Sequence, residues 1–371
     1  MKKSTGILLF IGMYLITAGV SYMFFGGSLG TKQMSAPPPV KNASGTVAFD
    51  DSLPKTEPCP MNGAKYSTQQ RAWWEKHRPL LIMIENHENA RPQSGLSKAD
   101  ITYEAVAEGG ISRTMNVFYC QDGGQVGPIR SARTYFLDWA SEYGDSPLYV
   151  HVGGANTDGP ADALGQIEEY GWGAYNDMNQ FSIGFPTFWR DYNRLGADTA
   201  TEHTMYSTTD KLWAVGEKRG LTNVDKKGNS WDSNFIEYTF KDDPSERPLS
   251  QSINFEFWKG YSDFAVTWDY DKATNTYLRS TGGAKHMDKD NGKQLFAKNV
   301  VILYMVELNA NDGYEDNLHL LYQTKGIGKA VVFQDGKEIQ STWTKKDRAS
   351  RLIIKDTKGK EIEFTRGKIW F

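Results

Sequence analysis

Four arginines lie beside glycine, proline or serine residues at the expected ends of secondary-structure segments: Arg91, Arg113, Arg130 and Arg133. A guanidinium group binds a carboxylate or a phosphate through two parallel hydrogen bonds. The segment from Arg130 to Arg133 follows Gly127-Pro128 and is expected to open a helix, whose N-terminus favours anions. These residues predict a pocket for a phosphorylated or acidic ligand. The alternative, which we favour, is that the arginines fix loops by pairing with nearby carboxylates, namely Asp100, Glu104 and Glu108.

Two of those carboxylates, Glu104 and Glu108, are four residues apart. This spacing places two side chains on one face of a strand, and makes them neighbours on a helix. Two carboxyl groups that meet could act as a general acid and a general base. Salt bridges with the arginines are again the favoured alternative.

Two histidines are candidates for binding or proton transfer. His151 precedes Gly153-Gly154 at the expected end of a strand, where ligand groups often gather, and His203 follows Glu202. A structural, hydrogen-bonded role is the favoured alternative for both. The predicted ligand-binding set is therefore Arg91, Glu108, Arg113, Arg130, Arg133, His151 and His203, and the weaker catalytic candidates are Asp100, Glu104 and His151.

Metal and cofactor motifs are missing from the sequence. The 6 histidines and 2 cysteines form no His-Glu-x-x-His or Cys-x-x-Cys pair, so we predict no metal and no cofactor. The segment from Asp288 to Gly292 has its glycine one position too early for a calcium loop, and predicts a hairpin turn. Neither a Gly-x-Ser-x-Gly elbow nor a phosphate-binding P-loop occurs, which counts against serine hydrolases and nucleotide hydrolases.

The elements that must position these residues divide into two parts. Strands and helices alternate over about residues 78–241, which predicts an α/β domain. Its expected strands are 80–85, 99–107, 114–120 and 148–152, and its expected helices are 134–143, 160–170 and 208–219. Beyond Asp242-Asp243-Pro244 the pattern changes to hairpins, such as 264–270 with 276–279, which predicts a mostly antiparallel β domain.

The N-terminal region predicts a membrane anchor. There is no charged residue between Lys3 and Lys32, and the apolar stretch from Ile7 to Phe25 is long enough to cross a hydrocarbon core of about 30 Å. A cleaved signal peptide would have a shorter apolar core and small residues at its end, whereas this stretch ends in Tyr22-Met23-Phe24-Phe25. We therefore predict an uncleaved single-pass transmembrane helix in the cell membrane, with the body on the extracytoplasmic side.

The predicted organisation is a membrane anchor over 1–30, a Pro/Ser-rich linker over 31–60, the α/β domain over 61–241 and the β-rich domain over 242–371. The two cysteines, Cys59 and Cys120, lie in a turn and after a strand. A disulfide is possible outside the cytoplasm, but two unpaired thiols are the favoured expectation. Because the net charge is −3 with no basic stripe, we expect no nucleic-acid partner.

Several longer motifs together resemble the YerB-like family of bacterial extracytoplasmic proteins. They include 60–63, 90–96, 108–113, 127–133 and 151–154 in the first part, and 268–271, 277–279 and 326–330 in the second. The resemblance covers about residues 60–371. It implies a cell-envelope protein with an α/β N-terminal domain and a β-rich C-terminal domain. Members of the family mostly look like lipoproteins and have no settled activity, so the resemblance implies a location more than a function.

A second, weaker resemblance is to the LytR-CpsA-Psr phosphotransferases, which hold a lipid pyrophosphate with arginines and an aspartate. It rests on the order of Ala99-Asp100-Ile101-Thr102, Ile129-Arg130-Ser131 and Gly153-Gly154. Ser131 stands where that family has an aspartate after the arginine, which counts against phosphoryl transfer.

The function expected from the sequence is binding of an anionic envelope polymer, lipid headgroup or partner protein through the Arg-rich site, with no activity demonstrated. The alternative is a phosphotransferase acting on a lipid-pyrophosphate-linked polymer with Asp100 and the same arginines. A hydrolase using Glu104, Glu108 and His151 is the third possibility.

Overall fold

The computed structural model describes residues 39–41, 46–196, 198–316 and 318–371, and residues 39–371 form one compact unit. The predicted anchor over Ile7–Phe25 lies outside the described residues, so it stays a prediction. None of the helices within the described ranges has the length and the apolar character that a bilayer crossing requires.

The first part of the body contains all the described α-helices and is built around a mixed sheet. The helices are α2 (Thr68–Trp74), α3 (Thr134–Ala140), α4 (Ala163–Glu169), α5 (Gln180–Ile183) and α6 (Thr209–Lys218). The strands are β1 (Val40–Lys41), β2 (Val47–Ala48), β3 (Lys55–Pro58), β4 (Lys65–Ser67), β5 (Leu80–Glu85), β6 (Ile101–Glu108), β7 (Ile111–Phe118), β8 (Gln125–Val126), β9 (Leu148–His151), β10 (Asp177–Asn179), β11 (Trp189–Arg190) and β12 (Met205–Thr208).

The second part consists of strands joined mainly by hairpins. They are β13 (Phe240–Lys241), β14 (Ser252–Phe255), β15 (Val266–Asp271), β16 (Thr276–Thr281), β17 (Ala284–Lys285), β18 (Phe296–Ala297), β19 (Asn299–Leu303), β20 (Glu307–Asn309), β21 (Leu320–Tyr322), β22 (Gly326–Gln334), β23 (Lys337–Lys345), β24 (Ile353–Asp356), β25 (Phe364–Thr365) and β26 (Ile369–Trp370). The prediction of a mixed α/β part followed by an antiparallel part is confirmed at this level.

A ten-stranded sheet runs through both parts, in the order β10-β9-β5-β7-β6-β26-β19-β22-β23-β24. Strand β5 pairs in parallel with β9 and antiparallel with β7, so the first part is mixed. All six residues of β5 are buried, which explains its continuous apolar sequence, because a strand covered on both faces needs no alternation.

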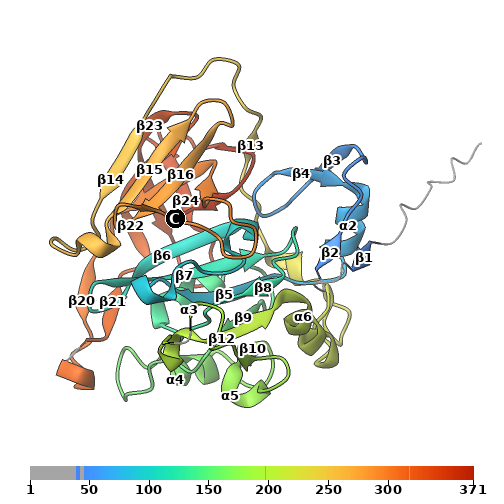
Figure 1. Ribbon diagram of the computed structural model, residues 1–371, viewed down its shortest axis with the longest axis vertical. Helices are drawn as coiled ribbons and strands as arrows, with labels where there is room; N and C mark the ends of the chain where they lie inside the picture. The colour runs from blue at the N-terminus through green and yellow to red at the C-terminus, as the bar shows by residue number, and fades with distance from the viewer. Residues whose placement is uncertain (1–38, 42–45, 197, 317) are drawn as a thin grey trace, which may run out of the picture. The chain divides into compact units, whose positions relative to one another are not determined.

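The last strand of the chain joins the two parts. Two-residue β26 pairs in parallel with β6 on one side and with β19 on the other. Figure 1 shows the strands of the second part, in orange and red, lying beside the teal strands β6 and β7 of the first. The predicted boundary near residue 241 stays a prediction, but any division there cuts across one continuous sheet.

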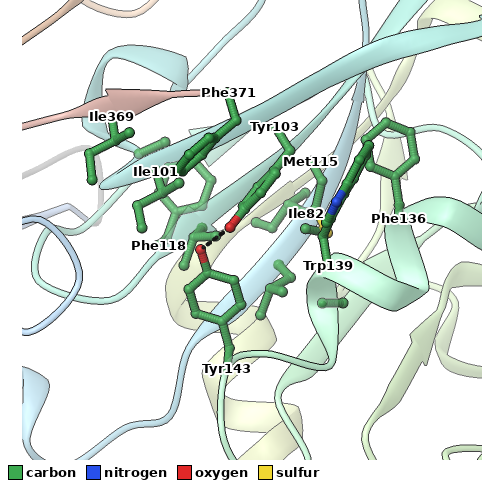
Figure 2. Close-up of a cluster of buried hydrophobic side chains, with 14 of the residues drawn as sticks. Ile82, Ile101, Tyr103, Met115, Phe118, Phe136, Trp139, Tyr143, Ile369 and Phe371 are labelled. Atoms are coloured by element: carbon green, nitrogen blue, oxygen red, sulfur yellow. Dashed lines mark hydrogen bonds between the residues drawn. The ribbon is translucent and has the colours of Figure 1, made fainter. Parts of the chain in front are cut away.

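The core at this junction is a stack of aromatic rings. Tyr103 lies between Phe371 and Trp139, with ring centroids 4.9 Å and 5.5 Å away and planes within 16° of parallel in both cases. Its hydroxyl is 3.1 Å from the hydroxyl of Tyr143, and Figure 2 shows the two oxygens facing each other inside the apolar cluster. The chain end at Phe371 is therefore packed into the core of the first part.

Cys59 and Cys120 form a disulfide, so the expectation of two unpaired thiols was wrong. The disulfide joins the turn after β3 to the segment after β7, and both cysteines are buried. Local sequence gave no measure of the distance between these two segments, because 61 residues separate them. Closing a loop of that length restricts the unfolded chain and contributes about 4 kcal/mol to stability.

Candidate functional site

Three of the four predicted arginines meet at one end of the β6–β7 hairpin. Arg113 Nη2 lies 3.1 Å from Glu108 Oε2, and Arg133 contacts the other oxygen of the same carboxylate. Arg130 Nε lies 3.3 Å from Glu85 Oε1. We call these five residues the arginine cluster. Four members of the predicted ligand-binding set, Arg113, Arg130, Arg133 and Glu108, therefore lie together, and a role in ligand binding stays a prediction.

Most of the cationic surface of the arginine cluster is closed. The side chains of Arg113 and Arg133 are only 7% and 8% exposed, while Arg130 is 30% exposed. Burial lowers the pKa of all three arginines, and nearby acidic groups oppose that shift. Each guanidinium is held by a carboxylate, which is the loop-fixing arrangement that the sequence favoured.

Glu104 and Glu108 lie on opposite faces of the sheet. The register of β6 against β7 shifts between Val106 and Glu108, which places an extra residue in β6. Such a bulge turns the following side chain to the other face. Glu108 therefore meets Arg113, whereas Glu104 accepts a hydrogen bond from Ser112. The prediction that a spacing of four puts both carboxylates on one face was wrong.

Arg91 lies apart from the arginine cluster. Its guanidinium donates to the backbone oxygens of Asn86 and Asp263 at 2.9 Å and 3.0 Å, and it lies over the ring of Phe264. Burial lowers the pKa of Arg91 to about 10. It belongs to a second, polar hollow of about 300 Å³ together with His286.

The two predicted histidines are buried in hydrogen bonds. His151 Nε2 lies 2.5 Å from Asp177 Oδ1, and its Nδ1 lies 2.6 Å from the carbonyl oxygen of Gly153. His203 Nδ1 lies 2.8 Å from Glu85 Oε2, which places it beside the arginine cluster. Both imidazoles are thus engaged in the structural manner that the sequence favoured.

Asp100 is fully buried and caps the end of β7. Its carboxylate accepts hydrogen bonds from the backbone N–H groups of Tyr119 and Cys120, at 2.9 Å and 2.8 Å. Burial raises the pKa of Asp100 to about 6, against those hydrogen bonds. Asp100 precedes β6 and Glu108 ends it, so the eight-residue strand separates Asp100 from Glu108 by roughly 25 Å.

Asp100 also belongs to a group of possible metal ligands with Cys59 and Cys120, whose ligand atoms lie within 4.8 Å of one another. Because the two sulfurs are bonded to each other, they are not the thiolates that a metal would require.

A cavity of about 400 Å³ lies where β6 and β26 meet the second part of the body, and we call it the aromatic pocket. It is bounded by β6, by the chain end, by β15 and β16, by the segment after β14, and by β19 and the residues that follow it. Its lining side chains are largely apolar or aromatic, and comprise Tyr103, Ala105, Val106, Trp139, Phe255, Phe257, Trp258, Trp268, Val300, Val301, Ile302, Leu303, Tyr304, Met305, Tyr322, Trp370 and Phe371. A volume of this size suits a small-molecule ligand.

Two pairs of charged residues line the aromatic pocket, one pair buried and the other exposed to solvent. Glu104 and Arg279 line it and are 2% and 0% exposed, with Arg279 Nη2 lying 2.9 Å from Glu104 Oε1. Glu256 and Glu307 line it as exposed side chains and mark its open side. The pocket thus has a desolvated ion pair at its floor and solvated carboxylates at its mouth.

Glu104 is held by several donors. Its Oε1 accepts from Arg279 and from Ser112, the latter at 2.7 Å, and its Oε2 accepts from Trp370 Nε1 at 2.9 Å. Asn86 adds a longer contact of 3.3 Å. With so many donors directed at it, this carboxylate is fixed and its oxygens are occupied.

Arg279 is held between two indoles, with the centre of its guanidinium 5.1 Å from the Trp268 ring and 4.6 Å from the Trp370 ring. Its Nε donates to His286 Nδ1 at 3.2 Å, so that nitrogen is unprotonated. His286 Nε2 must then carry the proton and donate to Gln93 Oε1, 2.7 Å away. Among the described residues, Arg279 Nη1 has no hydrogen-bond partner, although it is buried.

Arg279 is absent from the predicted site residues, although the alternation of its strand sets it apart. Strand β16 alternates, and Arg279 lies between Tyr277 and Thr281 on its buried side. An arginine at an inward position of an alternating strand is unusual, because charged side chains are seldom fully buried. That signal could have marked Arg279, but nothing in the sequence indicates that this face meets β26.

Comparisons with known proteins agree along most of the chain. Residues 66–222 match the family described as "Protein of unknown function (DUF3048) N-terminal domain", and residues 253–371 match its C-terminal domain. The chain is 31% identical over 327 residues to "Putative lipoprotein YerB" of Bacillus subtilis (strain 168), covering 86% of this chain and 88% of that protein. The crystal structure of YerB from Bacillus subtilis superposes with a TM-score of 0.67 at 26% identity, covering 85% of this chain and 95% of that one.

Proposed function

This chain belongs to the YerB-like DUF3048 family of proteins of unknown function, and on that premise we propose that it is a ligand-binding protein of the cell envelope. The name of its Bacillus subtilis relative, "Putative lipoprotein YerB", supports a body held at the outer face of a membrane. In this chain the predicted helix over Ile7–Phe25 would replace the lipid, and the linker that follows would separate the body from the membrane surface.

The ligand site in this proposal is the aromatic pocket. The observation that carries it is the cavity of about 400 Å³, which has aromatic walls and a desolvated ion pair at its floor. Binding pockets for small molecules combine apolar walls with a few fixed polar groups in this way. The pocket also lies at the junction of the two parts of the body, where such sites are common.

Binding fits the geometry better than catalysis does. The carboxyl and imidazole groups that the sequence offered as acids or bases are buried and hydrogen-bonded to the protein, these being Asp100, Glu104 and His151. A general acid or base must reach the proton that it moves. A phosphotransferase would also need Asp100 beside the arginine cluster, whereas Asp100 lies at the opposite end of β6 from Glu108.

Filling the pocket tests this proposal. Leu303 lines the pocket and is half-buried, so Leu303→Trp should occupy the cavity. Leu249 is 82% exposed and does not line it, so Leu249→Trp is the matched control for an added indole. The full chain in lipid nanodiscs would be titrated with 1-octanol, a neutral apolar probe, by calorimetry with lipid-only discs subtracted.

We expect saturable octanol binding by the wild type and by Leu249→Trp, and none by Leu303→Trp. Equal heats for the wild type and Leu303→Trp would overturn the aromatic pocket as the ligand site.

The arginine cluster is a second candidate, for an anionic envelope ligand. One observation favours it: the side chain of Arg130 is 30% exposed, and Arg133 Nε and the Tyr149 hydroxyl have no hydrogen-bond partner among the described residues. Inorganic pyrophosphate added to the full chain should then raise its Tm, and Arg130→Gln should remove that rise. An unchanged Tm of the wild type in pyrophosphate would exclude this second site.

A further inference from the structure

The unusual group in the aromatic pocket is Arg279, because one nitrogen of its guanidinium is unused. Its Nε and Nη2 are taken by His286 and Glu104, and its faces are covered by Trp268 and Trp370. Only the Nη1 edge is left without a hydrogen-bond acceptor among the described residues. A buried donor that stays unpaired costs its full desolvation, so an acceptor supplied from the cavity would be favourable.

Neither of the two described residues that are hydrogen-bonded to the guanidinium of Arg279 supplies that acceptor. Glu104 is fixed by donors on both oxygens, and His286 already uses Nδ1 to accept from Arg279. Burial, and after it the nearby cations Arg279, Arg91 and Lys368, hold the pKa of His286 well below its usual value. The imidazole is therefore neutral.

Two more basic side chains, Arg91 and Lys368, lie near Arg279 without lining the aromatic pocket. Arg279 has Glu104 as its carboxylate partner, but no carboxylate of the described residues lies within ion-pair distance of Arg91 or Lys368. Both interact electrostatically with Arg279. Burial lowers the pKa of Lys368 to about 7, and acidic groups act on both residues as well, Asp288 and Asp100 on Lys368 and Glu104, Glu88 and Asp263 on Arg91. The attraction for an anionic oxygen entering the pocket therefore comes from Arg279 itself, through the Nη1 group that no acceptor among the described residues uses.

The mouth of the pocket has the opposite charge. Glu307 is exposed and accepts hydrogen bonds from Trp258 Nε1, at 3.0 Å, and from the Tyr322 hydroxyl. Glu256 adds a second exposed carboxylate. These charges oppose a negative group held at the rim, while the apolar walls between rim and floor suit a hydrocarbon.

We propose that the ligand of the aromatic pocket is an amphiphile with one carboxylate, bound acid-first, whose oxygen accepts from Arg279 Nη1 while its apolar body contacts the pocket walls. This inference rests on the proposed function and adds the chemical class of the ligand. A carboxylate fits better than a phosphate, because it brings one negative charge rather than nearly two into a desolvated, largely apolar pocket.

Chain-matched probes test the inference. The full chain in nanodiscs would be titrated near neutral pH with octanoate, 1-octanol, octylamine and octyl phosphate, which share a tail and differ in the head. Because hydrogen bonds to charged groups are the stronger ones, we expect octanoate to bind about tenfold more tightly than octanol, with octylamine weakest. Octyl phosphate should not exceed octanoate.

Removing the cation sharpens this test. Arg279→Met alone would strand Glu104 in the core, so the variant is Arg279→Met combined with Glu104→Gln, which removes both buried charges. In that variant the preference for octanoate over octanol should disappear while octanol binding persists. If the double variant fails to fold, the four affinities of the wild type still decide the matter.

Three results contradict the inference in different ways. If octanol binds at least as tightly as octanoate to the wild type, the carboxylate is wrong and the aromatic pocket stands as the site. If neither probe binds, the inference and the proposed function fall together. Tighter binding of octyl phosphate than of octanoate would overturn the carboxylate in favour of a phosphate.

Discussion

The arginine cluster and the floor of the aromatic pocket are both made of buried arginines paired with glutamates, yet they differ in what surrounds them. In the arginine cluster the carboxylates of Glu85 and Glu108 close over the guanidinium groups of three arginines. In the pocket one carboxylate faces one arginine between two indoles, beside a cavity of about 400 Å³. The difference teaches that a concentration of cations does not make a site. A site also needs space for the ligand beside the cation.

The largest effect should come from breaking the pocket's ion pair. Glu104→Ala leaves Arg279 buried without its carboxylate, which should lower the free energy of unfolding by about 3–5 kcal/mol. Replacing both partners, with Glu104→Gln and Arg279→Met, should cost much less. Urea unfolding of the full chain measures both changes. A double variant that is as unstable as Glu104→Ala would contradict the treatment of the pair as an isolated buried salt bridge.

The free energy of unfolding should depend on pH through His286, which lies beside Arg279 at the floor of the aromatic pocket. Burial and the neighbouring cations hold its pKa well below the usual 6.5. Such a histidine stabilises the fold above its unfolded pKa, and this stabilisation is lost as the pH falls below about 6.5, because only the unfolded chain takes up the proton.

The slope from this group is about 1.4 kcal/mol per pH unit. His286→Gln should flatten the fall in stability below about pH 6.5 by that amount. His77, whose pKa burial lowers to about 4, contributes equally to both proteins and cancels in the comparison. Parallel pH profiles for the two proteins would refute this description of His286.

The arginine cluster should respond less to losing its carboxylate. The side chain of Glu108 is 21% exposed, so water can partly solvate Arg113 and Arg133 after Glu108→Ala. We expect a loss of about 2 kcal/mol in the free energy of unfolding, below that for Glu104→Ala. Urea unfolding of the two variants side by side gives the order. A larger loss for Glu108→Ala would reverse the comparison between the two regions.

The smallest effect should come from Arg130. Its side chain is the most exposed of the cluster, and its contact with Glu85 is long at 3.3 Å. Arg130→Gln should therefore change stability by less than about 1 kcal/mol. A loss as large as that for Glu108→Ala would mean that the cluster is more tightly coupled than its geometry indicates.

Local patterns in the sequence predicted elements well where these are long and uniformly patterned. The strand predicted over 80–85 has the same bounds as β5. Five consecutive apolar residues, Leu80–Ile84, follow Pro79 and end at Glu85, so both ends of the strand are visible in the sequence. The pairing of 264–270 with 276–279 corresponds to the β15–β16 hairpin. Two-residue β26 has no periodicity to detect, although it joins β6 to β19. The disulfide was missed for the same reason, since it depends on a contact between distant segments.

The sequence predicted most residues of the arginine cluster but not Arg279 of the aromatic pocket. Three arginines at the ends of neighbouring segments do converge, because β7 and the start of α3 meet at one end of the sheet. Glu108 faces them only because of a bulge in β6, which the sequence does not announce. Arg279 could not be assigned to a site from the sequence. Its place in the pocket depends on contact between β16 and the last strand of the chain, where its guanidinium lies over the Trp370 ring.

The central claim is that the aromatic pocket, and not the arginine cluster, takes the ligand. The most direct measurement is the dissociation constant of octanoate for the full chain in nanodiscs, in the wild type, in Leu303→Trp and in Arg130→Gln. We predict that Leu303→Trp abolishes binding and that Arg130→Gln leaves it unchanged. Binding that survives in Leu303→Trp and is lost in Arg130→Gln would contradict the claim.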